Sequence, residues 1–137
     1  MDTKKHELDA VREKGETLTV EFKSDQKCTP DRELVAAIVA LTNTEGGDLY
    51  LGVEDDGAVT GLHANHRDTT GLSALIANRT NPPVSVRGEL LDYKGTPVAR
   101  IRVPKSRQLV STSEGLLQRR RLLASGKPEA VPFYPHE

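Results

Sequence analysis

The sequence predicts an α+β fold, in which helices pack on one side of a mixed or antiparallel β-sheet. Between residues 34 and 41, apolar side chains recur at intervals of three and four, which is the spacing of a helix with one face on a core. From residue 48 the pattern changes to alternation, with Leu49, Leu51 and Val53 on one face of a half-buried strand. Further alternating segments follow residue 84, separated by turn signals, which favours a sheet over a helical bundle.

A short helix and a strand are predicted before this central helix. Residues 4–14 form a charged helix that ends at Gly15, and residues 18–23 alternate as a strand with one solvent-exposed face. Thr29 then caps the central helix, and Pro30 occupies its first turn. Gly46 and Gly47 end this helix, because glycine adopts the left-handed conformation without steric cost.

After the central strand, Asp56-Gly57 predicts a tight turn from which the chain returns at Val59. The remaining segments are a helix over 69–79 that ends before Asn81-Pro82-Pro83, strands over 84–91 and 97–103 joined by a hairpin at 93–95, a last strand over 116–122, and a proline-broken tail over 128–137. The 137 residues are expected to form a single domain, residues 1–137.

Two motifs resemble the Schlafen AlbA_2 domain family. One is Ala-Leu-Thr-Asn-Thr-Glu-Gly-Gly at residues 40–47, followed by a strand and a pair of acids; the other is Glu16, five residues before the Glu-Phe-Lys that begins at Glu21. The resemblance covers about the whole chain and implies a Schlafen AlbA_2-like fold and a DNA-binding or transcriptional-regulator module. It also implies a relation to the Schlafen nucleases, whose proposed catalytic acids stand at motif positions matching Glu16, Glu21 and Asp55.

We therefore treat Glu16, Glu21 and Asp55 as candidate catalytic residues and as candidate ligands of Mg²⁺ or Mn²⁺, which prefer oxygen donors. A separation of five residues places Glu16 and Glu21 on opposite faces of a straight strand, so they meet only if Glu16 precedes the strand. The alternative is that all three are ordinary surface acids. No ATP is expected, because the glycines at 52 and 57 are not followed by Lys-Ser/Thr.

The basic residues point to nucleic acid. The net charge is −1, but residues 1–68 carry −7 and residues 69–137 carry +6. Arginines of equal parity on two strands would form a basic ladder if the strands were neighbours, and phosphate would relieve its repulsion. The candidate nucleic-acid-binding residues are Lys23, Arg100, Arg102, Lys105, Arg107, Arg119 and Arg121. Aromatic residues are scarce, so contacts with the RNA or DNA backbone are expected rather than base stacking.

Composition limits the remaining classes. No apolar run approaches the roughly 20 residues that span a bilayer, and the polar N-terminus predicts no signal peptide. Cys28 is the only cysteine, which excludes an internal disulfide and favours a cytoplasmic setting. Cys28 has no histidine nearby in sequence and is expected to be inert, and His63 and His66 are expected on a surface loop.

The sequence is consistent with three functions. They are a nucleic-acid-binding module of the Schlafen AlbA_2 type, a metal-dependent endoribonuclease acting on structured RNA such as tRNA, and an oligomerisation or interaction domain. Relatives either duplicate this lobe or pair, so a homodimer is expected.

Overall fold

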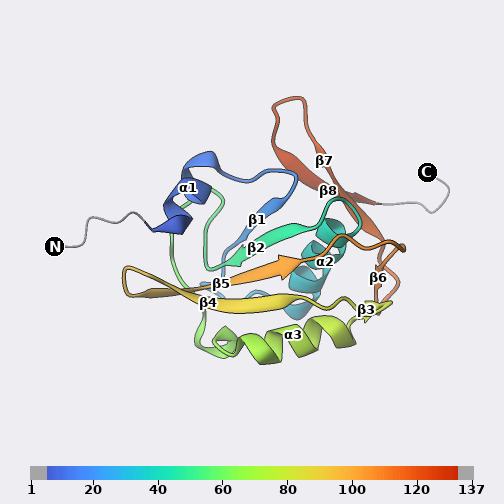
Figure 1. Ribbon diagram of the computed structural model, residues 1–137, viewed down its shortest axis with the longest axis horizontal. Helices are drawn as coiled ribbons and strands as arrows, with labels where there is room; N and C mark the ends of the chain where they lie inside the picture. The colour runs from blue at the N-terminus through green and yellow to red at the C-terminus, as the bar shows by residue number, and fades with distance from the viewer. Residues whose placement is uncertain (1–5, 133–137) are drawn as a thin grey trace.

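The structure is a computed structural model that describes residues 6–132 (Figure 1). Its helices are α1 (Glu7–Lys14), α2 (Asp31–Thr42) and α3 (Thr69–Asn78), with a short 3₁₀ turn η1 (Ala64–His66). Its strands are β1 (Val20–Lys23), β2 (Gly47–Leu51), β3 (Thr80–Asn81), β4 (Arg87–Tyr93), β5 (Thr96–Val103), β6 (Ser111–Thr112), β7 (Gln118–Leu122) and β8 (Pro128–Pro132). None of the helices in this described part is long and apolar enough to cross a membrane.

The central sheet has four strands in the order β1-β2-β5-β4. β1 runs parallel to β2, whereas β5 is antiparallel to both β2 and β4. Two smaller ladders join β3 to β6 and β7 to β8. The mixed sheet with packed helices confirms the predicted α+β class.

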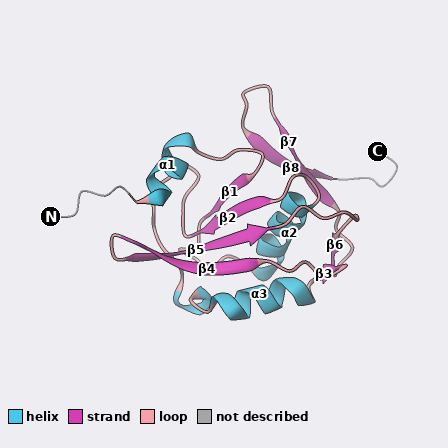
Figure 2. Ribbon diagram, viewed as in Figure 1, coloured by secondary structure: helices cyan, strands magenta, loops and turns pink. Residues whose placement is uncertain are grey.

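Helices cover both faces of this sheet, so the prediction that they lie on one side is wrong. Leu49, Leu51 and Ile101 pack with α2 and α3 in one core, and Figure 2 shows α2 crossing behind the sheet while α3 runs beside β4. On the opposite face, Tyr50 packs in a second core that also includes Leu8 of α1. Because β2 is apolar at successive positions, both faces of the sheet need cover.

The central helix and strand lie close to their predicted bounds. α2 begins at Asp31 with Pro30 as its N-cap, whereas Thr29 was predicted as the cap. Gly47 has a φ of 140°, and a Cβ there would lie 2.1 Å from the carbonyl oxygen of Thr19. The second glycine of the motif is therefore required by the close approach of the residue before β1 to the start of β2.

The C-terminal part departs most from the sequence prediction. Residues 128–132, predicted as part of a proline-broken tail, form β8 and pair with β7; residues 133–137 lie outside the described part. Proline is tolerated there because β8 is an edge strand of a two-stranded sheet. After β2 the predicted return of the chain is reduced to one bridge between Val53 and Val59.

Candidate functional site

A cavity of about 560 Å³ opens beside the β1 edge of the central sheet. Its walls come from the segment before β1, from β1 itself, from α2 and from the β7–β8 hairpin. Its charged lining residues are Glu16, Glu21, Lys23, Glu33, Asp55, Arg120 and Glu129. Acids outnumber basic residues in this lining, so the cavity suits a cation better than a bare phosphate.

The three predicted acids, Glu16, Glu21 and Asp55, all line this cavity. Glu16 precedes β1, and a tight bridge between Thr17 and Val20 turns the chain so that Glu16 lies alongside the strand. Its Oε2 accepts a hydrogen bond from the Phe22 amide at 3.1 Å. This turn brings Glu16 next to Glu21 and overcomes the five-residue spacing.

Burial is the largest of the causes that raise the pKa of Glu16 to about 7; the charge of Glu21, a hydrogen bond with Glu21 and the charge of Asp55 act in the same direction, and the Phe22 amide opposes them. A carboxyl group with this pKa exchanges its proton near neutral pH. Glu16 therefore has the property required of a general acid or base.

This pKa predicts a pH-dependent stability. Between about pH 4.5 and 7 the unfolded chain releases the Glu16 proton and the folded chain keeps it, so the stability due to this group is full below pH 4.5 and falls as pH rises through 7. Because Glu16 is only half buried and water screens its charge, the expected change in the free energy of unfolding is about 1–2 kcal/mol. Glu16→Gln keeps the acceptor for Phe22 and should gain thermal stability over the wild type as pH rises. A constant difference in melting temperature from pH 4 to 8 would contradict the assignment.

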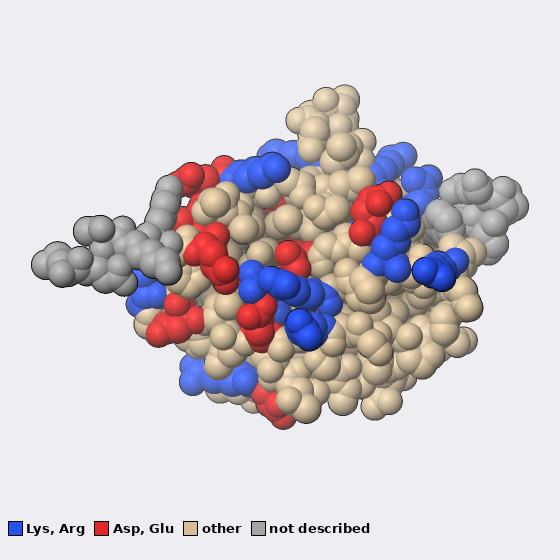
Figure 3. All heavy atoms as spheres, viewed as in Figure 1, with Lys and Arg blue, Asp and Glu red and all other residues tan. Residues whose placement is uncertain are grey.

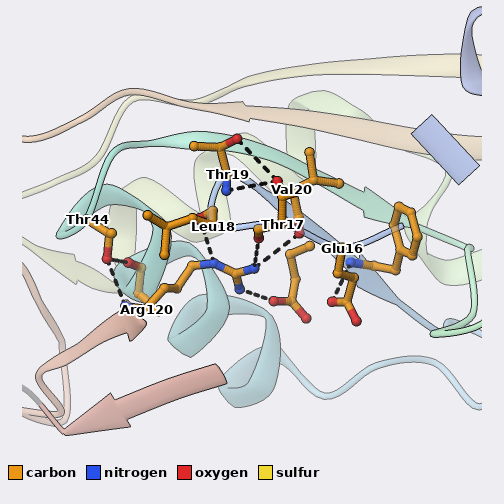
Figure 4. A network of polar contacts seen from close by, with 10 residues as sticks. Glu16, Thr17, Leu18, Thr19, Val20, Thr44 and Arg120 are labelled. Atoms are coloured by element: carbon orange, nitrogen blue, oxygen red, sulfur yellow. Dashed lines mark hydrogen bonds and ion pairs between the residues drawn. The ribbon is translucent and has the colours of Figure 1, made fainter. Parts of the chain in front are cut away.

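Arg120 is the residue of this site that the sequence reasoning missed. It is 3% exposed, and its guanidinium forms an ion pair with Glu21 and donates to the carbonyl oxygens of Leu18 at 2.9 Å, Thr17 at 2.6 Å and Val20 at 3.1 Å (Figure 4). The alternation of side chains along a strand could have indicated it, because Arg120 is the middle of three consecutive arginines and therefore faces the opposite side of β7 from Arg119 and Arg121. Arg120 thus fixes the β7–β8 hairpin to the turn that presents Glu16 and Glu21.

The Thr-Asn-Thr part of the 40–47 motif attaches the same hairpin to α2. The Asn43 amide donates to the carbonyl oxygens of Val110 at 2.8 Å and Gln118 at 2.9 Å, and its oxygen accepts from the Val110 amide. Thr44 Oγ1 accepts from the Arg120 amide at 2.8 Å. These side chains therefore hold the cavity wall rather than line the cavity.

Glu16, Glu21 and Asp55 supply the oxygen donors that Mg²⁺ and Mn²⁺ prefer. Within residues 6–132, however, no three His, Cys, Asp or Glu side chains are gathered closely enough to hold a metal ion. Glu21 is also engaged by Arg120, while Asp55 is exposed on the turn after β2. The donor chemistry fits such a metal, and the three carboxylates would have to draw closer together for one ion to bind all of them.

The predicted basic ladder is not formed. Arg100 and Arg102 lie in β5, whose neighbours are β2 and β4, whereas Arg119 and Arg121 lie in the separate β7–β8 ladder. Arg100 is tied to Glu89 at 2.5 Å and to Glu7 at 3.4 Å.

The other predicted basic residues are dispersed. Lys23 lines the cavity, and Arg121 pairs with Glu129 at 2.6 Å. Lys105 pairs with Glu45 at 3.5 Å, and Arg107 is exposed in the loop after β5.

Two arginines face each other across β4, an edge strand of the central sheet, and its neighbour β5. Arg87 of β4 lies directly opposite Arg102 of β5, and both side chains are exposed. Glu89 contacts Arg102 at 3.6 Å and also pairs with Arg100. Figure 3 shows this gathering of basic and acidic side chains over β4 and β5. We call Arg87, Arg100 and Arg102 the arginine face; Arg87 was not among the predicted residues.

Solved structures share this fold at low sequence identity. The DIP2311 protein from Corynebacterium diphtheriae is 20% identical with a TM-score of 0.68, over 85% of this chain and 22% of that one. The N-terminal domain of a RecG-related protein from Nitrosomonas europaea is 21% identical with a TM-score of 0.63, over 95% and 94%. This chain therefore spans about a fifth of the Corynebacterium protein's structure and nearly all of the Nitrosomonas domain.

The family comparison agrees with the two sequence motifs. The model of the Schlafen, AlbA_2 family matches residues 16–122, from the first cavity acid to the end of β7. The match includes both motifs, the arginine face and Arg120. Because it extends over most of the 137 residues, the chain belongs to the Schlafen AlbA_2 family.

Proposed function

We propose that this protein is a nucleic-acid-binding module that contacts the phosphate backbone through the arginine face. The observation that carries the proposal is the Arg87–Arg102 pair, two exposed like charges at directly opposed positions of an antiparallel ladder. Such a pair is destabilising by itself. Glu89 contacts Arg102 and offsets part of the repulsion, and an anion between the two arginines would offset the rest. Phosphate fits the planar fork of arginine.

The family and one structural relative support the same class of ligand. The Nitrosomonas protein is named for its relation to RecG, an ATP-dependent DNA helicase. The side chains at the exposed end of this surface, Arg87, Arg102 and Glu89, are charged, and the neighbouring Tyr50 is buried, which suits backbone contacts more than base readout.

Binding is tested by fluorescence anisotropy with labelled duplex DNA, single-stranded DNA and RNA at increasing salt. Each phosphate contact steepens the fall of log K with log salt by about 0.9 on duplex DNA and about 0.7 on single strands. A measurable affinity with a slope of two or more supports the proposal. Absence of binding to all three probes at low salt would refute it.

A metal-dependent endoribonuclease is the second candidate, and the cavity favours it. Glu16, Glu21 and Asp55 line one cavity, and Glu16 titrates near neutral pH. A bound Mg²⁺ or Mn²⁺ would polarise a phosphodiester and lower the pKa of bound water. In this arrangement Glu21 and Asp55 would hold the ion, Glu16 would accept or donate a proton at its carboxyl if it stays outside the coordination shell, and Arg120 would hold Glu21 in position.

Metal binding predicts a thermal shift. At a Mn²⁺ concentration ten times the dissociation constant, the folded state gains about 1.4 kcal/mol, which raises the melting temperature. Asp55→Asn should abolish the gain, whereas Asp56→Asn, on the same exposed turn, should keep it. Glu21→Gln is a poorer probe, because it also removes the partner of buried Arg120.

An equal thermal shift in wild type and Asp55→Asn would remove Asp55 from the metal site. Incubation with total RNA, with and without the metal, then separates a nuclease from a binding module. Cleavage that requires metal and Asp55 favours the enzyme.

We also propose a homodimer in the cytoplasm, as the single cysteine and the pairing of relatives suggest. Light scattering checks the dimer: a mass near 15 kDa at high micromolar concentration would contradict it.

A further inference from the structure

Three side chains from two loops meet beside the N-terminus of α2. Asp25 and Cys28 lie in the loop between β1 and α2, and His66 ends η1. His66 is 6% exposed rather than on the surface as predicted, and its Nδ1 lies 2.8 and 2.9 Å from the two carboxylate oxygens of fully buried Asp25. Cys28 Sγ lies 3.8 Å from His66 Nε2, so the cysteine has the histidine partner that its sequence neighbourhood lacks.

The hydrogen bonds of Asp25 determine how His66 is oriented. Its carboxylate also accepts the amides of Thr29 and His63, each at 2.8 Å, which anchors it between the two loops. A carboxylate beside Nδ1 accepts the proton of that nitrogen, so the neutral ring presents the lone pair of Nε2 to the sulfur. Carboxylate, imidazole and thiol then stand in the order that activates a nucleophile.

Cys28 itself has two further features of a reactive thiol. Its φ is 55°, a left-handed conformation that is uncommon for residues other than glycine and that clusters at functional sites. The Asn65 side-chain amide donates toward Sγ from 3.8 Å, which favours a negative charge on the sulfur. Cys28 is intermediate in exposure and is not part of the fully buried core.

We propose that Cys28 is a hydroperoxide-reactive thiolate, activated by His66 and positioned by Asp25. His66 Nε2 takes the thiol proton, and the sulfur attacks the nearer peroxide oxygen. The O–O bond breaks, the sulfur is oxidised by two electrons to a sulfenic acid, and the leaving oxygen departs as water or alcohol with the proton returned by His66. Because Cys28 is the only cysteine, no second thiol of this chain converts the product to a disulfide.

The test measures the initial rate of Cys28 thiol loss with hydrogen peroxide at pH 7. The reference is a synthetic peptide of residues 24–30, which has the same neighbours but no His66. An ordinary thiol is only a few per cent thiolate at this pH, so the folded protein should react about tenfold faster than the peptide. Trapping with a sulfenic-acid-specific dione, followed by mass spectrometry, identifies the product on Cys28.

His66→Gln separates activation from structure, because its amide can still donate to Asp25 but cannot take the thiol proton. This variant should react about tenfold more slowly than wild type at an unchanged melting temperature. Arg67→Gln changes an exposed residue that directly follows η1 and should keep the wild-type rate.

A folded protein that reacts no faster than the peptide would overturn the proposal, even if the His66 variant failed to fold. Equal rates in wild type and folded His66→Gln would also overturn it. Neither result depends on nucleic-acid binding, so this inference and the proposed function can fail independently.

Discussion

Replacing Arg120 by methionine is expected to lower the free energy of unfolding by about 3 kcal/mol. Methionine roughly preserves the volume of the side chain but removes the donors that bind Glu21 and the carbonyl oxygens of Thr17, Leu18 and Val20. The loss is large because the guanidinium is almost completely buried, so water cannot replace these bonds in the folded state. Urea unfolding monitored by circular dichroism measures the change.

Arg121→Met is the matched control on the same strand. Arg121 pairs with Glu129 on an exposed surface, and exposed pairs contribute about 0–1 kcal/mol. A loss of stability in the Arg121 variant equal to that in the Arg120 variant would show that the buried network does not anchor the hairpin. A similar m-value in all three proteins is needed to attribute the difference to stability.

Replacing both Arg87 and Arg102 by alanine is expected to weaken duplex DNA binding about 30-fold at 0.15 M salt, with a salt slope smaller by about 1.8. The reason is the loss of two phosphate contacts, each of which releases condensed counterion. Stability should change little, because the loss of the exposed Arg102–Glu89 contact is offset by removal of a like-charge pair from opposite positions of β4 and β5. Anisotropy titrations at several salt concentrations give both quantities.

The matched control is Arg32→Ala with Arg79→Ala, which changes the net charge equally at exposed positions of α2 and the end of α3. This pair should leave the slope close to that of the wild type. An equal loss of affinity in the control would indicate attraction by overall charge and would refute a localised interface. A wild-type slope in the Arg87/Arg102 variant would do the same.

Local patterns in the sequence were sufficient to predict the central helix and strand and to indicate the three acids of the cavity. The spacing at residues 34–41 and the alternation after residue 48 led to α2 and β2, because a periodic side-chain pattern reports the local backbone conformation. The two family motifs also indicated Glu16, Glu21 and Asp55, which line one cavity.

Pairing between distant segments was decided only by the tertiary structure. The sequence does not state which strands are neighbours, so the ladder of Arg100 and Arg102 with Arg119 and Arg121 was expected but not formed. The pairing of β7 with β8, which turns a predicted tail into a cavity wall, depends on inter-strand hydrogen bonds and on Arg120 reaching the turn before β1.

The same limit applies to Cys28, whose histidine partner is 38 residues away. Side-chain periodicity carries information over a few residues, whereas a buried ion pair or a Cys–His contact depends on how whole elements pack. The sequence by itself therefore determined the central helix and strand and the identity of the chemical groups. The packing of these elements decided which groups meet, because burial and desolvation exist only in the folded chain.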